Sequence, residues 1–152
     1  MSLLLGKEYC KVDPSGRFKF PIAMKRQLED GECRFAIRES IVADCLELWP
    51  IASFSEELLF LQSRLRTYHP QERELLRKLS ASNIVELDSS DRVLVPPEQK
   101  PRLKGAKEIV LQATGKFIEI WDRKTYDEMN NQSVDYVKMA EEMLYQSTEQ
   151  QL

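Results

Sequence analysis

The chain has 152 residues, of which 42% are hydrophobic and 31% are charged, and its net charge is −3 at pH 7. This composition is typical of a globular protein with one domain or two very small ones. No stretch approaches the roughly 18 consecutive apolar residues of a membrane span, and the first residues, MSLLLGKEYC, lack the basic and long apolar regions of a secretory signal, so we expect neither a membrane nor a secreted protein.

The first motif in chain order is VDPSGRFKFP at residues 12–21. A strand over 8–12, a polar turn and a second strand that stops at Pro21 are predicted here. The second strand alternates basic and aromatic side chains. If Phe18 and Phe20 face the core, Arg17 and Lys19 point outward on one face, and Lys11 on the neighbouring strand can join them.

The acidic residue of this motif, Asp13, has a simple structural explanation, because an Asp carboxylate accepts amide protons from the turn that follows it. This explanation accounts less well for Arg17, since an exposed ion pair between the two is worth only ~0–1 kcal/mol. A rigid strand face that carries Arg and Lys is a known way to contact phosphates and base edges in a DNA groove. Arg17 and Lys19 are therefore candidates for contact with nucleic acid.

The next segment, PIAMKRQLED at 21–30, is predicted as a short helix, with Pro21 in its first turn and Gly31 at its end. It adds Lys25 and Arg26 to the basic candidates. Residues 7–26 carry six basic and two acidic side chains, a local charge of +4 despite the negative total. The segments at 33–40 and 44–50 are then predicted as a hairpin.

Residues 53–83 are helical in pattern, with a break at His69 and Pro70. The apolar positions share one helical face: Phe54, Leu58, Leu61, Leu65, Leu75, Leu76 and Leu79. Such a stripe is typical of core or of an interface between subunits. His69, the only histidine, is expected to have a structural role.

The segment LDSSDRVLVP at 87–96 repeats the first motif. At an offset of 75, Asp13 recurs as Asp88, Arg17 as Arg92 and Pro21 as Pro96. Trp49 and Trp121 match at an offset of 72, and the second copy also has a strand at 83–87 and a predicted hairpin over 107–114 and 115–121. Units of this size cannot bury both faces of their strands, so the two copies should pack together or interdigitate.

The second copy is the weaker candidate for DNA contact. An acid, Asp91, precedes Arg92, and Leu94 stands where the first copy has Lys19. Pro101 predicts that the helix after Pro96 is short or broken. Residues 81–107 have a local charge of only +1. We expect the first copy to bind DNA more firmly and the second to serve mainly in assembly.

The end of the chain is again helical in pattern, with apolar residues at Tyr126, Met129, Val134, Val137, Met143 and Leu144. The last residues, QSTEQQL, are polar and are expected to fray. Residues 122–152 have a local charge of −4, opposite to that of the first copy.

Nothing in the sequence predicts an enzyme or a cofactor. The three cysteines, Cys10, Cys33 and Cys45, have no CxxC spacing and are expected to be reduced and structural. A single histidine makes a zinc site hard to build. No nucleophile with a base partner and no glycine-rich phosphate loop is present, so we expect no catalysis, no metal, no cofactor and no small-molecule substrate.

The doubled D-x-x-x-R turn, the Pro four residues after each Arg, the Trp at each strand end and the helical segment between the copies resemble the MraZ family. The resemblance runs from about Gly6 to Met129. It implies an α+β fold, largely β, in which two tandem swapped-hairpin AbrB-type units form a pseudo-twofold barrel linked and followed by helices. The expected division is 6–53 for the first unit, 54–81 for the helical linker, 82–125 for the second unit and 126–152 for the C-terminal helix and polar tail.

The same resemblance implies a sequence-specific DNA-binding transcriptional regulator in the cytoplasm, associated with the nucleoid. Its expected role is repression of the division and cell-wall gene cluster, including its own gene. The family binds short direct repeats in double-stranded DNA as a ring-shaped homo-oligomer, an octamer or larger. Its DNA-contacting arginines map onto Arg17 and Arg92, with Asp13 and Asp88 as the motif acids. An alternative from the residues alone is an interaction ring without a DNA role, in which the Asp–Arg pairs hold subunits together.

Overall fold

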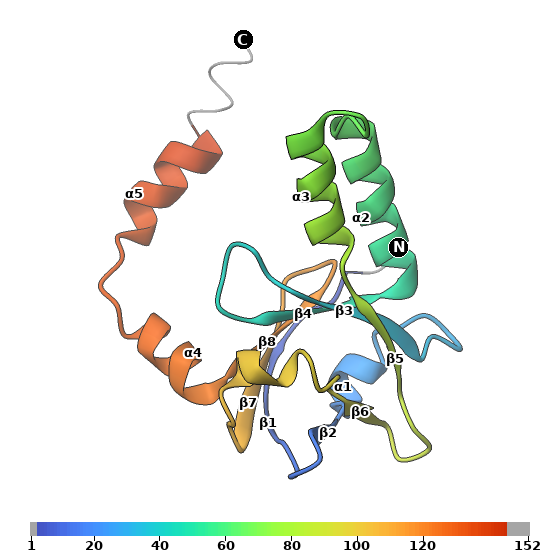
Figure 1. The fold of residues 1–152 in the computed structure, drawn as a ribbon. Helices are drawn as coiled ribbons and strands as arrows, with labels where there is room; N and C mark the ends of the chain where they lie inside the picture. The colour runs from blue at the N-terminus through green and yellow to red at the C-terminus, as the bar shows by residue number, and fades with distance from the viewer. Residues whose placement is uncertain (1–2, 146–152) are drawn as a thin grey trace.

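The computed structural model describes residues 3–145, so the predicted polar end at 146–152 lies outside the described residues. It has the expected α+β fold (Figure 1). The strands are β1 (Lys7–Lys11), β2 (Arg17–Lys19), β3 (Arg34–Glu39), β4 (Leu46–Pro50), β5 (Asn83–Glu86), β6 (Arg92–Leu94), β7 (Glu108–Ala113) and β8 (Ile118–Asp122). The helices are α1 (Ile22–Lys25), α2 (Ile51–Arg64), α3 (Pro70–Ser80), the 3₁₀ helix η1 (Lys100–Leu103), α4 (Arg123–Asn130), α5 (Tyr136–Ala140) and the π-helical η2 (Glu141–Tyr145).

The strands form two antiparallel sheets that mix the two copies. One sheet has the order β1-β7-β8-β4-β3-β5, and the other pairs β2 with β6. Each copy therefore gives its first strand to the hairpin of the other copy: β1 pairs with β7, and β5 pairs with β3. Exchanging the strands of one copy for those of the other leaves both strand orders unchanged, which is a pseudo-twofold relationship. The predicted swapped hairpins are thus confirmed, while closure into a barrel stays a prediction.

The strand register shows that residues matched by the sequence repeat are related by a pseudo-twofold axis. Phe18 lies opposite Val93 in the β2–β6 pair, and these residues are 75 positions apart. Glu47 lies opposite Glu119 in the β4–β8 pair, and these are 72 positions apart. Both offsets found in the sequence are therefore offsets between residues that the axis relates. The division of the chain into separate units at 6–53 and 82–125 stays a prediction.

The main cluster of buried apolar residues joins the two copies. Phe18, Phe20, Val93 and Val95 are each no more than 1% exposed, and they lie in one cluster with the inner residues of both hairpins. The rings of Phe20 and Phe35 are 5.3 Å apart. Because residues of both copies fill the same core, neither copy buries its apolar face alone.

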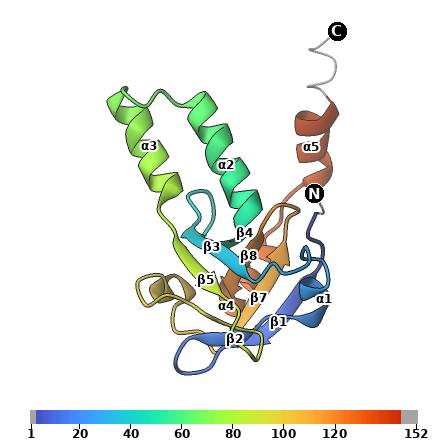
Figure 2. The same ribbon diagram turned by 90° about the vertical axis from the view of Figure 1, so that its right-hand side faces the viewer.

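The helices α2 and α3 form a hairpin that projects from one end of the sheet, opposite the end where the turns before β2 and β6 lie (Figures 1 and 2). His69 has the predicted structural role, because its side chain accepts a hydrogen bond from the amide of Glu72 and caps α3. Phe54 is buried against Trp49, but Leu59 and Phe60 are more than half exposed. No helix within residues 3–145 is long and apolar enough to cross a membrane.

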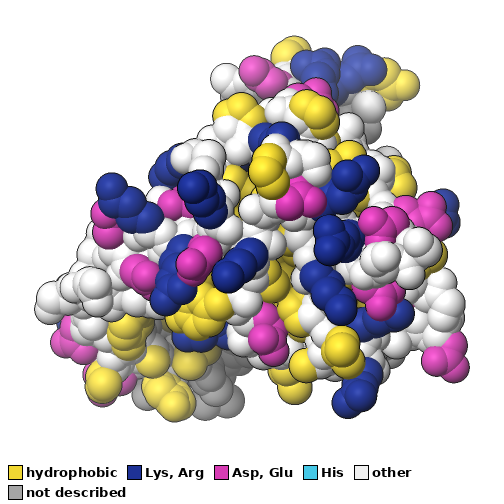
Figure 3. All heavy atoms as spheres, turned by 90° about the horizontal axis from the view of Figure 1, so that it is seen from below, with side chains coloured by type: hydrophobic (Ala, Val, Ile, Leu, Met, Phe, Trp, Pro, Cys, Tyr) yellow, Lys and Arg dark blue, Asp and Glu magenta, His cyan; other side chains and the backbone are white. Residues whose placement is uncertain are grey.

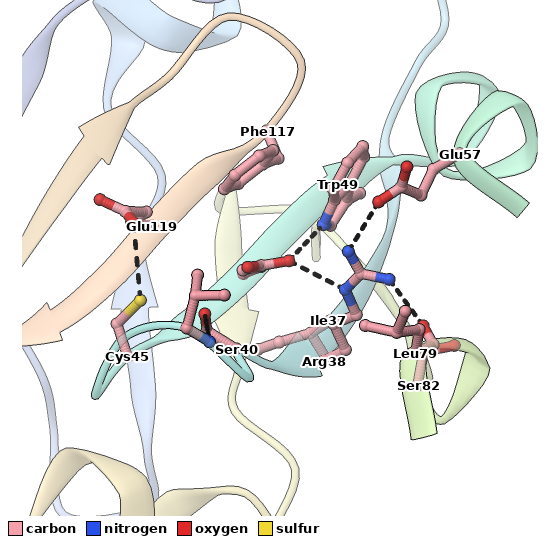
Figure 4. A network of polar contacts seen from close by, with 12 residues as sticks. Ile37, Arg38, Ser40, Cys45, Trp49, Glu57, Leu79, Ser82, Phe117 and Glu119 are labelled. Carbon is pink, nitrogen blue, oxygen red and sulfur yellow. Dashed lines mark hydrogen bonds and ion pairs between the residues drawn. The ribbon is translucent and has the colours of Figure 1, made fainter. Parts of the chain in front are cut away.

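A buried arginine fastens this helical hairpin to the sheet (Figure 4). The guanidinium of Arg38, in β3, donates to Glu47 at 2.8 Å, to Glu57 of α2 at 2.9 Å and to the carbonyl oxygen of Leu79 in α3 at 2.6 Å. It also lies 5.0 Å from the ring centre of Trp49. One side chain therefore contacts the sheet and both helices.

The structure differs from the sequence predictions in the helix after Pro21. Residues 21–30 were predicted as one helix, but α1 covers only Ile22–Lys25 and continues as turns, with Pro21 as its N-cap. The equivalent segment of the second copy is the short 3₁₀ helix η1, which confirms the effect expected of Pro101.

The cysteines are unpaired thiols in the part of the chain that the structure describes. Burial raises the pKa of the Cys10 thiol to about 11, and it also raises the pKa of Cys45, which is fully buried. Both thiols are therefore protonated at neutral pH and are poor nucleophiles. This environment fits the structural role expected of them.

Candidate nucleic-acid interface

The first D-x-x-x-R turn is braced by its acid. The Oδ1 atom of Asp13 accepts hydrogen bonds from the amides of Ser15 at 3.0 Å and Arg17 at 2.9 Å, and from the Ser15 hydroxyl at 2.6 Å. The hydroxyl contact, followed by the Arg17 amide, lowers the pKa of Asp13. The predicted role of Asp13 as a turn brace is confirmed.

The second turn repeats this arrangement. The Oδ1 atom of Asp88 accepts from the amides of Ser90 at 2.8 Å and Arg92 at 2.9 Å. The Arg92 amide is the main cause of the lowered pKa of Asp88. Both motif acids therefore hold the amide of their own motif arginine and fix the backbone from which its side chain starts.

The residue before each arginine has a left-handed backbone. Gly16 has φ +93° and Asp91 has φ +59°. Glycine adopts this conformation freely, and Asp is among the few other residues that tolerate it. The carboxylate of Asp91 accepts a hydrogen bond from Nζ of Lys25 at 2.8 Å. The acid that distinguishes the second motif is thus accommodated by the turn and paired with a lysine of the first copy.

The two motif arginines emerge on one surface, because β2 and β6 are neighbours. In this two-stranded ribbon Arg17 lies opposite Leu94, and Lys19 lies opposite Arg92. Phe18 and Val93, between them, are buried, whereas Arg17, Lys19 and Arg92 are exposed. The predicted outward face of β2 is confirmed. From the sequence we expected a separate outward face on each copy. In the structure, β2 and β6 share one exposed face, which carries the three cations Arg17, Lys19 and Arg92.

The side chains of Arg17 and Arg92 make only long polar contacts. Nη1 of Arg17 donates to the Ser15 hydroxyl at a long 3.4 Å. Arg92 has a side chain that is 51% exposed, and its Nη1 lies 3.7 Å from Oδ2 of Asp13. The charge of Arg17 in turn contributes to the lowered pKa of Asp88. Each arginine thus faces the acid of the other copy across the ribbon, and both heads reach solvent.

The other predicted residues lie around this ribbon face. Lys11 is exposed at the end of β1 and lines, with Arg17 and Arg92, an open groove of about 630 Å³. Lys25 is 47% exposed at its side chain and is ion-paired with Asp91. Arg26 is exposed at the C-terminus of α1. Their roles in binding stay predictions.

Sequence reasoning did not single out Lys100. Its Nζ atom donates to the carbonyl oxygen of Ser15 in the first turn at 3.3 Å. With Lys11 and Lys107 it lines a second groove, of about 760 Å³, whose walls are otherwise mostly apolar. The offset of 75 that joins Arg17 to Arg92 also joins Lys25 to Lys100, so the repeat itself carried the signal.

Charged side chains cover this end of the molecule. Figure 3, which views it from below, shows basic side chains gathered in groups with acidic ones interspersed. Within residues 3–145, no three or more His, Cys, Asp or Glu side chains lie close enough to hold a metal ion. The arrangement can present cations to a polyanion.

The sequence is similar to known proteins over nearly its whole length. Residues 79–146 match the family model described as "MraZ protein, putative antitoxin-like". The chain is 32% identical over 147 residues to the transcriptional regulator MraZ of Christiangramia forsetii, covering 93% of this chain and 92% of the relative. It is 31% identical to the protein of the same name from Flavobacterium psychrophilum, covering 95% and 93% of the two chains. The protein of that name from Mycoplasmoides gallisepticum is 28% identical, covering 93% and 97%.

Proposed function

The chain belongs to the MraZ family of transcriptional regulators, and from this premise we propose that it binds double-stranded DNA in a sequence-specific manner through the ribbon of β2 and β6. One observation carries the proposal: Arg17, Lys19 and Arg92 stand together on the exposed face of a ribbon whose other face is buried. The braced turns fix the start of each arginine side chain, so its ordering costs less entropy on binding.

The ribbon suits a DNA groove in shape and charge. A two-stranded β-ribbon fits the major groove, where Arg can donate two hydrogen bonds to guanine. Lysines beside the ribbon can neutralise phosphates and set the position of the protein without reading sequence. The roles follow: Arg17 and Arg92 contact bases, and Lys19 with Lys11 and Arg26 contacts the backbone.

We also propose that the protein assembles with itself. Helix α2 and the C-terminal elements expose apolar side chains that a monomer leaves in water. They include Leu59, Phe60, Tyr136, Val137, Met143 and Leu144. Contact between copies through these surfaces would bury them and leave the ribbon at the opposite end of the sheet open to DNA. A ring of eight or more subunits, as the family resemblance implies, would present successive ribbons to short direct repeats.

The biological role that follows is regulation of transcription in the cytoplasm, in association with the nucleoid. The family resemblance favours repression of the division and cell-wall gene cluster, with the protein's own gene among its targets. Neither a cofactor nor a small-molecule substrate enters this function.

The test is binding of the purified protein to duplex DNA from upstream of its own gene, followed by fluorescence anisotropy over a salt series. Arg17→Ala and Arg92→Ala should each raise Kd by roughly tenfold, the value expected for loss of a base contact. Arg77→Ala, on the exposed surface of α3, is the matched control and should bind like the wild type.

Light scattering on the same variants separates DNA contact from assembly. If Arg17→Ala binds DNA as tightly as the wild type, the role assigned to Arg17 is wrong. If Arg17→Ala instead breaks the assembly, Arg17 holds subunits together as in the interaction ring, and the DNA-binding proposal fails.

A further inference from the structure

Lysines 25 and 100 are equivalent under the pseudo-twofold relationship, and each reaches the turn of the other copy. Nζ of Lys25 lies 2.8 Å from the Asp91 carboxylate in the second turn. Nζ of Lys100 lies 3.3 Å from the Ser15 carbonyl oxygen in the first turn. Its Cε atom lies only 2.9 Å from the place that a Cβ on Gly16 would occupy. Each turn is therefore completed by a lysine from the other repeat.

The two turns differ in how that lysine is compensated. In the second turn the Asp91 carboxylate accepts the ammonium of Lys25 directly. In the first turn Gly16 occupies the same position and has no side chain to offer. Among residues 3–145, no carboxylate lies within ion-pair distance of Lys100, which donates instead to a neutral backbone carbonyl. Within the described residues, the first turn thus has two cations, Arg17 and Lys100, that make no ion pair, beside the single carboxylate of Asp13.

On the basis of the function proposed above, we propose that Lys100 of the second repeat is a phosphate-binding residue of the first turn, and that Asp91 neutralises its counterpart Lys25. The first turn is then the stronger DNA contact, and it takes one of its two cations from the second repeat. Lys11 and Lys107 line the same groove as Lys100, together with the acid Asp13. Lys11 also lines the groove of Arg17, so these lysines extend a path for the DNA backbone from one groove to the other.

The first experiment compares two equivalent variants, Lys100→Ala and Lys25→Ala, on duplex DNA from upstream of the protein's gene. Loss of one phosphate contact reduces the salt dependence of binding, the slope of log K against log salt, by about 0.9. Lys100→Ala should show this reduction and a Kd raised several-fold. Lys25→Ala removes a lysine that is paired with Asp91 and contacts no phosphate, so it should leave the salt slope at the wild-type value. Thermal unfolding and light scattering confirm that both variants fold and assemble.

The second experiment restores the missing charge. Asp91→Gly introduces a residue that tolerates φ +59°, and it frees the ammonium of Lys25 from its ion pair with the Asp91 carboxylate. It should lower Kd and increase the salt slope by about 0.9, as expected for one added phosphate contact. The double variant Asp91→Gly with Lys25→Ala should lose this gain, which shows that the gain comes from Lys25 and not from the removal of a repulsive acid.

The outcomes distinguish this inference from the function on which it rests. If the wild type binds DNA and Arg17→Ala weakens binding, but Lys100→Ala and Lys25→Ala behave alike, the assignment of Lys100 is overturned. If Asp91→Gly gains nothing, or if the double variant keeps the gain, the neutralising role of Asp91 is overturned. If the wild type and Arg17→Ala bind equally, the proposed function itself fails.

Discussion

The acid of one repeat faces the arginine of the other: Oδ2 of Asp13 lies 3.7 Å from Nη1 of Arg92. The other oxygen of the same carboxylate, Oδ1, holds the amides of its own turn. Asp13 thus shapes its own turn and places a negative charge beside the second one. Because the turns share this residue, a change in one should alter the other.

Stability should depend on pH through the two motif acids. Hydrogen bonds hold the pKa of Asp13 and Asp88 below 3.8 in the folded protein, so their contribution to stability is complete above pH 3.8. It is lost as the pH falls through the lowered values, because both carboxylates then become protonated. The double variant Asp13→Asn with Asp88→Asn should therefore have a lower free energy of unfolding than the wild type at pH 7. The two free energies should converge as the pH falls, which urea unfolding at pH 7 and in acid will show. A constant difference down to pH 2 would contradict this.

The left-handed position in the first turn should require glycine. Gly16→Ala places a Cβ at φ +93° and within 2.9 Å of Lys100 Cε, so we expect a loss of about 1–3 kcal/mol in the free energy of unfolding. The equivalent change in the second turn, Asp91→Ala, should cost less, because that turn already accommodates a Cβ. Urea denaturation of the two variants gives the comparison, and equal losses would contradict the strain argument.

The arginine that fastens the helical hairpin should be costly to remove. Arg38→Met leaves the buried carboxylate of Glu47 without its cation, and we expect a loss of about 3–5 kcal/mol in the free energy of unfolding. Adding Glu47→Gln should restore part of it, since no buried charge then stays unpaired. The control is Gln112→Ala: Gln112 lies opposite Glu119 as Arg38 lies opposite Glu47, and it makes a neutral hydrogen bond with Tyr126, worth about 1 kcal/mol.

The buried side of the ribbon should control stability, and its exposed side should not. Phe18 is 1% exposed at the centre of the β2–β6 pair, so Phe18→Ala should lower the free energy of unfolding by about 3–5 kcal/mol. Leu94, 41% exposed on the other face, should change it by less than about 0.5 kcal/mol when replaced by Ala. Chemical denaturation measures both, and a large effect at Leu94 would show that this face is covered in solution.

Assembly should depend on the apolar side chains of the C-terminal helices. Val137 in α5 is 71% exposed and Met143 in η2 is 65% exposed. Val137→Glu and Met143→Glu place charges where we propose that copies meet, so light scattering should report a smaller particle. Lys138→Gln, a polar change on α5, should leave the particle size unaltered. An unchanged mass for both glutamate variants would locate the contact between copies elsewhere.

Local pattern was enough to predict the turns, the strands and the outward direction of Arg17 and Lys19, because each depends on residues close together in the sequence. The repeat and the family resemblance together predicted that the copies interlock. Neither the local pattern nor the repeat could predict the register of β2 against β6, because packing of Phe18 and Val93 in a shared core sets it. For this reason the union of both arginines on one face, and the reach of Lys100 across to Ser15, became visible only in the structure.

The exchange of first strands between the repeats also fixes an order of events during synthesis. Strand β1 leaves the ribosome early, but its partner β7 is among the last strands to be made. Lys7, for example, can pair only after Gln112 has been synthesised. Until then the edge of β1 and the aromatic side chains of β2 have no cover, and such exposed edges promote aggregation. The nascent first repeat therefore cannot complete its fold alone, because β2 needs β6 to form the ribbon and β1 needs the still later β7.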